Sequence, residues 1–506
     1  MKTVLTPEQM SRCDAFSIGA LTANGESPYL FMERAAEACV STLMELFPDK
    51  KRVLVLAGNG ANGGDGIAAA RLLEERGVRA EVCMPDPDAR RSAACEEQIR
   101  RAEEAEVRFR PYETLDFSRY DLLVDALFGT GLSRPLDGVF AETVRRMNES
   151  GLPVLAVDIP SGVDGRNGQC PGGAVRAEVT VTMQYPKPGL YLYPGADFVG
   201  TLRTADLGIG GEAVAEEPVL QALEEDDIPR LLPKRAKNGN KGTFGRVLIA
   251  AGSEDMSGAA FFSAKAAYRC GAGLVRILTP GENRVILAEK LPEALITTYD
   301  ARHPDLGVFQ SAAAWADVCV LGPGIGTGEG AVRMAQSVLD TLAKKERCPL
   351  ILDADALNLL AMGKIAVPAG IPVIYTPHPG ELSRLSGISV PELLSDLPVQ
   401  AREYAKKLPS GAVLIAKDAR TVTTDGEQAY LNLSGCSALA KGGSGDVLTG
   451  ILAALCASGC APMDAAALGV YLHGRAGELL ARDWGVRGVM ASELPDAAAV
   501  LLKDLD

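Results

Sequence analysis

The sequence predicts an α/β protein of two domains, each a three-layer sandwich around a mostly parallel sheet. The chain has 506 residues, which is too long for one ordinary domain. Short apolar runs alternate with helical stretches, a pattern typical of right-handed βαβ units. Two glycine-rich loops, at 58–66 and 442–446, lie at strand and helix ends in different halves of the chain. Such loops let backbone amides approach an anion closely.

The first half contains one helical region followed by alternating strands and helices. Residues from about 10 to 46 are predicted to be helical. The strand Val53–Ala57 leads through the first glycine loop into a helix over Gly66–Arg76. The strand Leu122–Ala126 is followed by a glycine turn and a helix near Phe140–Asn148. We expect the carboxyl ends of these parallel strands to share one edge of the sheet.

A composition break separates this series from a second one. The glycines of 208–211 and the acidic run Glu224–Asp227 mark it. We therefore place the first domain at 1–212, a linker at 213–226 and the second domain at 227–506. The second series begins with the strand Gly245–Ala250 and includes a strand over Asp317–Leu321. Its glycine loop opens a long apolar helix.

Composition and charge exclude several classes of partner. The net charge of −14 argues against nucleic acid or an anionic membrane surface, but not against small anionic substrates. The 11 cysteines include no C-x-x-C pair, so we expect reduced thiols. The first residues lack the apolar core of a signal peptide, and no stretch reaches the roughly 20 apolar residues of a spanning helix. We expect a cytoplasmic homo-oligomer with no membrane partner.

The first glycine loop fits G-x-G-x-x-G through Gly58, Gly60 and Gly63. A dinucleotide-binding Rossmann domain is the first interpretation. Asp65 weighs against it, because its charge would meet the pyrophosphate at the helix N-terminus. Asp65 as a simple helix N-cap is the alternative.

Four motifs in order make the first half resemble a known family. They are Asn62–Gly66, Val124–Gly131, Asp158–Asp164 and Tyr185–Gly189. Residues 1–212 thereby resemble the NAD(P)H-hydrate epimerase family (the YjeF N-terminal domain), which has a Rossmann-like fold. Ala61 departs from the family pattern, which usually has asparagine there. The resemblance implies inversion of the hydrated carbon of a damaged nicotinamide ring.

The resemblance also implies the epimerase site. Asp158 is expected as the acid/base residue, and Lys187 as holder of the opposite proton or of a phosphate. Asn62, Asp125 and Ser161 each follow an apolar strand, so their oxygens suit a hard monovalent cation, and the resemblance implies potassium. Simple turn capping by Asp125 and Ser161 is the alternative. The expected substrate contacts are Ala61, Asn62, Gly63, Gly64, Asp65, Gly129, Thr130, Gly131, Leu132, Ser133, Arg134, Pro135 and Asp158.

The second half resembles another family through a different motif set. The motifs are Lys241–Gly245, Gly322–Gly326, Thr376–Glu381 and Gly442–Asp446. Residues 227–506 resemble the ribokinase-like superfamily and, within it, the ADP/ATP-dependent NAD(P)H-hydrate dehydratases. The last motif alone would leave any small-molecule kinase open.

The Gly442–Asp446 motif places an aspartate directly after an anion-binding turn. This arrangement is suited to the transfer of a phosphoryl group to a hydroxyl. Asp446 is expected to accept the hydroxyl proton, while amides near Gly445 hold the phosphoryl group; helix capping is the alternative for Asp446. Mg²⁺ is expected on the phosphates of ADP or ATP, with Glu381 as a water-mediated anchor. The substrate contacts implied are Ala259, Gly326, His378 and Asp446, His378 having a purely structural alternative. The nucleotide contacts implied are Lys417, Asp418, Ala419, Arg420, Thr421 and Gly445.

Together the two halves predict a bifunctional repair enzyme for hydrated NADH and NADPH. The first domain would interconvert the R and S epimers, and the second would dehydrate the S form at the expense of ADP, or else ATP. The alternative is a small-molecule kinase fused to a non-catalytic ligand-binding domain.

Overall fold

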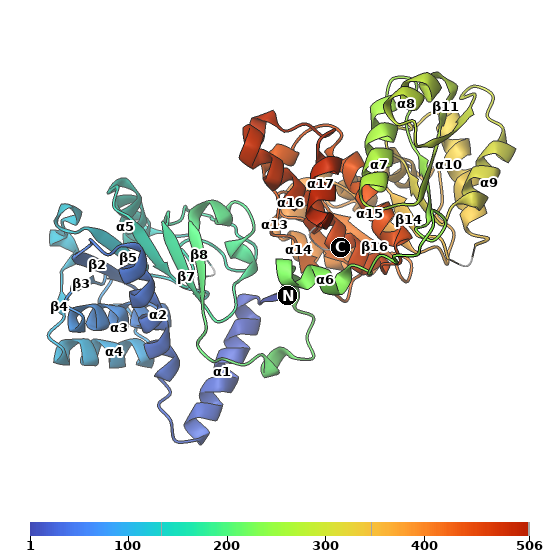
Figure 1. The fold of residues 1–506 in the computed structure, drawn as a ribbon. Helices are drawn as coiled ribbons and strands as arrows, with labels where there is room; N and C mark the ends of the chain where they lie inside the picture. The colour runs from blue at the N-terminus through green and yellow to red at the C-terminus, as the bar shows by residue number, and fades with distance from the viewer. Residues whose placement is uncertain (133, 346, 504–506) are drawn as a thin grey trace. The chain divides into compact units, whose positions relative to one another are not determined.

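The computed structural model describes residues 1–132, 134–345 and 347–503, and the chain divides into two units. Thr3–Val219 form the N-terminal unit. Met1–Lys2 and Leu220–Asp506 form the C-terminal unit, most of which is coloured green to red in Figure 1. Strand β9 (Leu220–Ala222) belongs to the C-terminal sheet, although its residues fall in the segment expected to be a linker.

The N-terminal unit is built on a seven-stranded sheet in the order β4-β3-β2-β5-β6-β7-β8. Every neighbouring pair is parallel, as the alternating pattern predicts. The strands are β2 (Arg52–Ala57), β3 (Arg79–Cys83), β4 (Arg108–Phe109), β5 (Leu122–Ala126), β6 (Val154–Val157), β7 (Val179–Met183) and β8 (Thr201–Ala205). The helices are α1 (Pro7–Ala23), α2 (Leu30–Leu46), α3 (Ala61–Glu75), α4 (Ala93–Glu104) and α5 (Gly138–Glu149).

Alternation along β2 places this sheet between two helical layers. Val53 and Val55 join the core cluster that contains residues of α2, α3 and α4. Leu54 and Leu56 join the cluster that contains residues of α5. Successive strand residues point to opposite faces, so both faces are covered. The predicted three-layer sandwich is confirmed.

Helix α3 begins at Ala61, five residues earlier than the sequence predicts, so that prediction was wrong. The glycines at 63, 64 and 66 lie inside the helix, where they allow close packing. A Cβ on Gly66 would lie 2.3 Å from the Cβ of Ala126, and one on Gly64 would lie 3.0 Å from Cε of Met32. The many glycines of this segment, which predicted a loop, instead allow α3 to pack closely against β5 and α2.

The C-terminal unit contains an eleven-stranded sheet in the order β1-β9-β18-β17-β16-β15-β14-β13-β10-β11-β12. The run from β16 to β12 is parallel, whereas β17 pairs antiparallel with both of its neighbours. The remaining strands are β1 (Lys2–Val4), β10 (Arg246–Ala250), β11 (Leu274–Pro280), β12 (Leu295–Tyr299), β13 (Val318–Leu321), β14 (Leu350–Leu352), β15 (Val373–Tyr375), β16 (Val413–Ala416), β17 (Val422–Thr424) and β18 (Ala429–Leu431).

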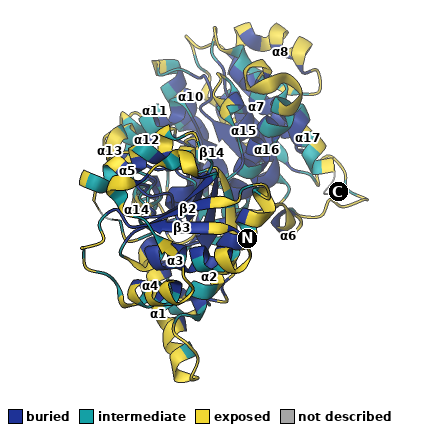
Figure 2. Cartoon of the chain, turned by 90° about the vertical axis from the view of Figure 1, so that its left-hand side faces the viewer, coloured by how far each residue is buried: buried dark blue, intermediate teal, exposed yellow. Residues whose placement is uncertain are grey.

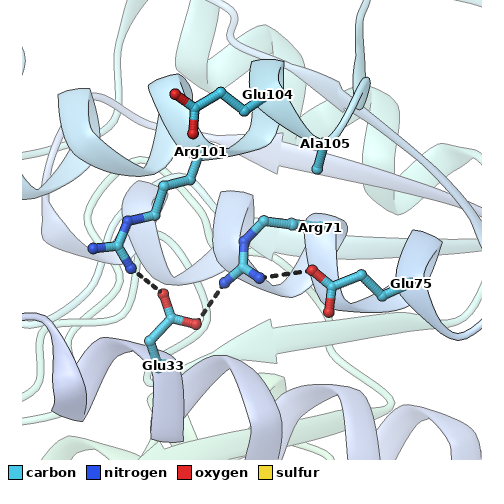
Figure 3. Close-up of a pocket in the computed structure, with 6 residues that line it drawn as sticks. All are labelled: Glu33, Arg71, Glu75, Arg101, Glu104 and Ala105. Carbon is cyan, nitrogen blue, oxygen red and sulfur yellow. Dashed lines mark hydrogen bonds and ion pairs between the residues drawn. The ribbon is translucent and has the colours of Figure 1, made fainter.

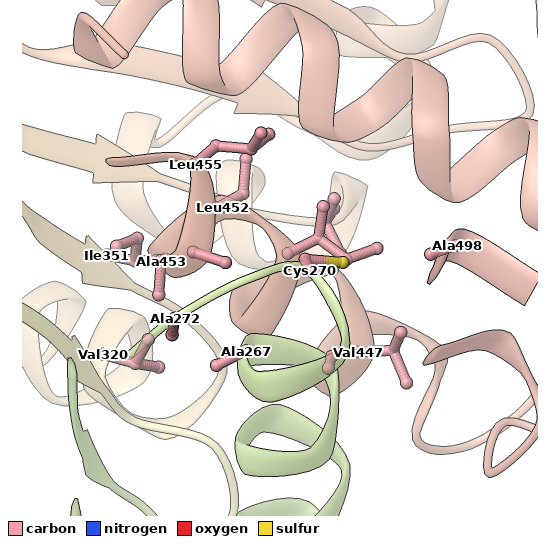
Figure 4. Packing of buried hydrophobic residues seen from close by; sticks show 14 of the residues in the cluster. Ala267, Cys270, Ala272, Val320, Ile351, Val447, Leu452, Ala453, Leu455 and Ala498 are labelled. Carbon is pink, nitrogen blue, oxygen red and sulfur yellow. The ribbon is translucent and has the colours of Figure 1, made fainter. Parts of the chain in front are cut away.

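Helices cover both faces of this sheet as well. Val247 and Ile249 of β10 pack in one large cluster with α7, α15, α16 and α17, part of which is shown in Figure 4. Helix α9 contacts β10 and β11. The helices are α6 (Ile228–Leu231), α7 (Ser257–Arg269), α8 (Arg284–Lys290), α9 (Leu306–Trp315), α10 (Glu329–Leu342), α11 (Asp355–Ala361), α12 (Pro379–Ser386), α13 (Val390–Ser395), α14 (Leu397–Ala405), α15 (Ser444–Ala457), α16 (Pro462–Gly488) and α17 (Leu494–Lys503).

Burial follows these layers. In Figure 2 the strands β2, β3 and β14 are largely buried, whereas α1 is exposed along much of its length. Among the described residues, no helix has the length and apolar character needed to cross a membrane. All 11 cysteines are free thiols.

Candidate active sites

The N-terminal site lies where the strand order of the sheet reverses. From β2 the chain moves outward through β3 and β4, and it returns to the other side of β2 at β5. Ligands of open α/β sheets bind in the crevice at the carboxyl ends of strands at such a point. The turn after Ala57 and the described residues 127–132 and 134–135 after β5 lie at this edge. Most of the predicted epimerase residues are therefore brought together.

Asn62, Asp125 and Ser161 surround one turn after β5. The Ser161 hydroxyl donates to Oδ1 of Asp125 (2.6 Å), and its amide donates to Oδ2 (2.7 Å). The amide of Phe128 donates to the Ser161 hydroxyl (2.9 Å). A Cβ on Gly129 would lie 3.2 Å from Oδ1 of Asn62. Burial raises the pKa of Asp125 to about 6, although the Ser161 bonds oppose the rise.

Turn capping, the alternative role of Asp125 and Ser161, is present in the structure, because the two side chains stabilise this turn. One observation goes beyond turn capping: the buried Nδ2 of Asn62 has no hydrogen-bond partner among the described residues. Exchanging the positions of Nδ2 and Oδ1 in the Asn62 side chain would place an amide oxygen there. This oxygen would join the Asp125 carboxylate and the Ser161 hydroxyl. This donor set fits a hard monovalent cation.

Lys187 and Asp158 form a buried ion pair at the ends of β6 and β7. The Nζ of Lys187 lies 2.5 Å from Oδ1 of Asp158, and the Lys187 side chain is 1% exposed. The same oxygen accepts from the Thr182 hydroxyl and from the Met183 amide, each at 3.1 Å. Oδ2 of Asp158 accepts no hydrogen bond from the described residues, so this atom is left for a ligand. Lys187, expected to hold a proton or a phosphate, lies behind Asp158.

Asp158 also has an unusual backbone conformation. Its φ is +66°, in the left-handed region that non-glycine residues rarely adopt. The Asp158 amide donates to the Val181 carbonyl (2.8 Å), which ties this turn to β7. Such strain is found at sites where a side chain must be held in one orientation.

Two further carboxylates, Asp65 and Asp14, lie close to this pair. Burial raises the pKa of Asp65 well above its ordinary range; Asp158 and Asp14 add to the rise and Lys187 opposes it. Burial raises the pKa of Asp14 to about 6, with Lys187 opposing and Asp158 adding. Asp65 is not the N-cap of α3, since Gly60 occupies that position. The capping alternative for Asp65 is therefore wrong.

The rest of the predicted epimerase contacts lie at the start of α3 and in the segment after β5. Ala61 is exposed at the start of α3, and Gly63 and Gly64 are buried behind it. Thr130 and Leu132 are half-buried, while Gly131, Arg134 and Pro135 are exposed. Ser133 lies outside the described residues.

The C-terminal site lies at the carboxyl edge of the parallel strands β13 to β16. Helix α15 starts after Gly443, whose φ of +90° only glycine adopts easily. Asp446 lies in the first turn of α15 and is not its N-cap, so the capping alternative is wrong here too. Its carboxylate accepts no hydrogen bond from the described residues. Burial raises the pKa of Asp446 to about 7, Asp353 and Asp355 add, and Lys417 opposes.

Lys417 supplies the positive charge of this site. Its Nζ donates to Oδ1 of Asp353 (2.9 Å), and the Thr376 hydroxyl donates to the same oxygen (2.6 Å). Burial alone would lower the pKa of Lys417, but Asp353, Glu381 and Asp446 together raise it. A Cβ on Gly445 would lie 3.6 Å from Nζ of Lys417. Lys417 and Gly445, both predicted nucleotide contacts, are thus neighbours.

His378 and Glu381 stabilise the start of α12. Nδ1 of His378 accepts from the Gly380 amide (3.0 Å), and the His378 amide donates to Glu381 (2.9 Å). The structural role proposed as the alternative for His378 is therefore present, yet its side chain is 53% exposed and open to a ligand. His473 lies behind Ser444 of the second glycine loop, 3.1 Å from the Ser444 hydroxyl, and burial lowers its pKa to about 4.

The other predicted contacts surround Asp446 and Lys417. Gly326 donates its amide to Asp355 (2.8 Å), and a Cβ on Gly324 would lie 3.0 Å from the Cβ of Ala259. Asp418, Ala419, Arg420 and Thr421 form the turn between β16 and β17. The tip of this turn, at Asp418 and Ala419, is exposed.

A separate surface pocket of about 390 Å³ lies on the N-terminal unit, among α2, α3 and α4 (Figure 3). Glu33 accepts from Arg71 (2.5 Å) and from Arg101 (2.9 Å), and Arg71 also pairs with Glu75 (2.9 Å). Both arginines of this pocket are paired with carboxylates, so the residues that line it connect α2, α3 and α4 through ion pairs.

Both halves of the chain match known protein families. Residues 29–189 match the family model of the YjeF-related protein N-terminus, and residues 247–499 match that of NAD(P)H-hydrate dehydratase. The chain is 36% identical to the bifunctional NAD(P)H-hydrate repair enzyme Nnr of Moorella thermoacetica, over 97% of this chain and 96% of that protein. The chain belongs to the family of bifunctional NAD(P)H-hydrate repair enzymes.

Other members of the repair-enzyme family and a solved structure agree with this assignment. The Nnr enzyme of Escherichia coli strain K12 is 35% identical, over 93% of this chain and 88% of that protein. A ribokinase-like superfamily protein of Enterococcus faecalis is 27% identical, covers 56% of this chain and 96% of its own, and has a TM-score of 0.50. The predicted family and fold class are confirmed.

Sequence motifs missed two groups of this repair enzyme. Asp14 carries no motif, because it lies within a region that the sequence predicts only to be helical. Asp353 follows the apolar strand β14, a position that marks the site edge, but its pairing with Lys417 depends on which strands are neighbours.

Proposed function

We propose that this chain epimerises hydrated NADH and NADPH in its N-terminal unit and dehydrates the S epimer in its C-terminal unit. The observation that supports this most is that carboxylate oxygens at the carboxyl edge of each sheet accept no hydrogen bond from the described residues. They are Oδ2 of Asp158 and both carboxylate oxygens of Asp446. Each carboxylate would take a proton from the hydroxyl of the same water adduct. Family membership supports the substrate class.

In the N-terminal unit Asp158 is the proposed general base, and Lys187 holds it in one orientation. Oδ1 is fixed by three donors, which leaves Oδ2 to meet the hydroxyl of the hydrated ring. A positioned acid or base of this kind contributes about 10²–10⁴ in rate. Residues 61–65 and 129–135 would line the substrate. Asn62, Asp125 and Ser161 would hold potassium, which would supply a fixed positive charge to the site.

In the C-terminal unit Asp446 would take the hydroxyl proton as the hydroxyl oxygen attacks the terminal phosphoryl group of ADP or ATP. Hydroxide leaves poorly, whereas the phosphate ester departs with the C–O electrons, and loss of a ring proton restores the dihydropyridine. Gly445 and the turn 417–421 would hold the nucleotide, with Lys417 beside its phosphates. Mg²⁺ would arrive on those phosphates, because it keeps most of its waters and needs few protein ligands. Ala259, Gly326 and His378 would contact the ring.

The experiment is incubation with chemically hydrated NADH, Mg²⁺ and either ADP or ATP. Release of inorganic phosphate together with recovery of the reduced-nicotinamide absorbance is the expected result. A phosphorylated product that persists would instead favour the small-molecule kinase. We further propose a cytoplasmic homo-oligomer, to be tested by light scattering of the purified protein.

A further inference from the structure

Asp158 and Asp65 lie in opposite environments within one cluster. Asp158 accepts from an ammonium, a hydroxyl and an amide at 2.5–3.1 Å. Asp65 is partly buried, and no described residue donates a hydrogen bond to its carboxylate. The charge of Lys187 opposes the pKa rise of both Asp14 and Asp65. The ammonium is bound to Asp158.

The position of Asp65 suits contact with a ligand. It lies on α3 three residues after Asn62, at the strand-order reversal, where ligands of open α/β sheets bind. Burial raises the pKa of the Cys39 thiol, on α2, and the charges of Asp65 and Asp158 both add to the rise. Asp65, on α3, and Asp158, after β6, therefore act electrostatically on the same neighbour from different elements.

We propose that Asp65 is the general acid of the epimerase site, the partner of the general base Asp158. This inference rests on the proposed epimerase function. A carboxylate that has no hydrogen-bond donor and lies among like charges keeps its proton. Asp158, by contrast, accepts hydrogen bonds from three donors at Oδ1, and its Oδ2 is left for the hydroxyl of the substrate. The two side chains therefore differ as the acid and the base of one site do. Lys187 does not fill the acid role, because its side chain is buried behind Oδ1 of Asp158.

The step balances without any further reactant. Asp158 takes the hydroxyl proton, the O–H electrons form a carbonyl, and the C–N bond breaks with its electron pair moving to nitrogen. Nitrogen takes the proton of Asp65. After the carbonyl turns over, nitrogen attacks its other face and returns a proton to Asp65, while oxygen regains one from Asp158. Both carboxyl groups end in their starting states.

The test compares Asp65→Asn with Asp14→Asn in the full chain, measuring interconversion of the R and S epimers from pH 5 to 10. We expect Asp65→Asn to lose at least about 100-fold in kcat/KM. The wild type should lose activity as the pH rises through the raised pKa of Asp65, and this fall is the alkaline limb of its profile. Asp14→Asn keeps its maximal rate but moves this alkaline limb to lower pH, because a negative neighbour of Asp65 is gone. Asp158, Lys187 and Cys39 remain in both variants.

Two results would overturn the inference: epimerisation within threefold of wild type in Asp65→Asn, or an unmoved alkaline limb in Asp14→Asn. The second readout does not depend on whether Asp65→Asn folds. Asp158→Asn separates this inference from the proposed function. If Asp158→Asn epimerises normally, the function of the site is wrong; if only Asp65→Asn does, the acid assignment alone is wrong.

Discussion

Gly63 lies against Gly58 so closely that a Cβ on Gly63 would be 1.9 Å from the Gly58 carbonyl oxygen. Backbone atoms cannot move aside at that distance, so α3 can start beside β2 only with glycine at position 63. The contact fixes the first turn of α3, which carries Asn62 and Asp65.

Gly63→Ala should therefore destabilise the N-terminal unit and abolish epimerisation. Gly60→Ala is the matched control, because a Cβ at Gly60 has nothing within 4 Å. Denaturant unfolding should show a large loss for Gly63→Ala and a change of a few tenths of a kcal/mol for Gly60→Ala. Equal stability of the two variants would contradict this packing.

Lys187→Met should destabilise the same unit strongly, because it leaves the Asp158 carboxylate buried without its cation. Removing one partner of a buried pair costs about 3–5 kcal/mol. The double variant Lys187→Met/Asp158→Asn should recover much of that loss. Arg145→Met, which breaks an exposed ion pair on α5, should leave the unfolding midpoint nearly unchanged. A strictly additive double variant would show that the two side chains do not interact.

Dehydration should depend on the ionisation of Asp446. A group that accepts a proton must first be ionised, so kcat/KM rises with pH and levels off above about 7, near the pKa of Asp446. Asp446→Asn should lose dehydration at every pH. A flat profile in the wild type from pH 5 to 8 would argue against this base.

The same pKa predicts how the stability of the C-terminal unit varies with pH. The folded pKa of Asp446 lies above the unfolded value of about 3.9, so folding favours the protonated form. Stability is greatest below pH 4 on this account and declines as pH rises through about 7. Asp446→Asn should remove this decline and be the more stable protein at pH 8, as measured by denaturant unfolding.

Potassium should act on the N-terminal unit alone. Replacing potassium by sodium is expected to slow epimerisation severalfold and to leave dehydration by the same chain unchanged. Bound potassium would also raise the melting temperature of the N-terminal unit, since it binds only the folded state. Asp125→Asn should lose both effects. Identical rates and melting in the two salts would contradict the cation site.

The sequence predicted the layers and most site positions, because strand ends and glycine loops are local features. Asp446 and Lys417 could be located in this way. The start of α3 was mispredicted, because local sequence cannot distinguish a glycine in a loop from one packed against a neighbouring strand. Gly63, Gly64 and Gly66 fill the second role.

Pairings between distant elements could not be predicted. Lys187 meets Asp158 only because β6 and β7 are neighbours in the sheet. Asp14 joins them because α1 is held to the Lys187 segment, where the Leu5 amide donates to the Pro186 carbonyl (3.0 Å). No spacing in the sequence encodes either contact.

The most direct measurement follows both epimers by chromatography when hydrated NADH, as an R and S mixture, is supplied with ADP and Mg²⁺. Wild-type protein should consume both epimers, Asp158→Asn only the S epimer above the enzyme-free rate, and Asp446→Asn neither, while still interconverting them. If Asp158→Asn consumed both epimers at the wild-type rate, or if Asp446→Asn still formed NADH, the two sites would not have the activities assigned to them.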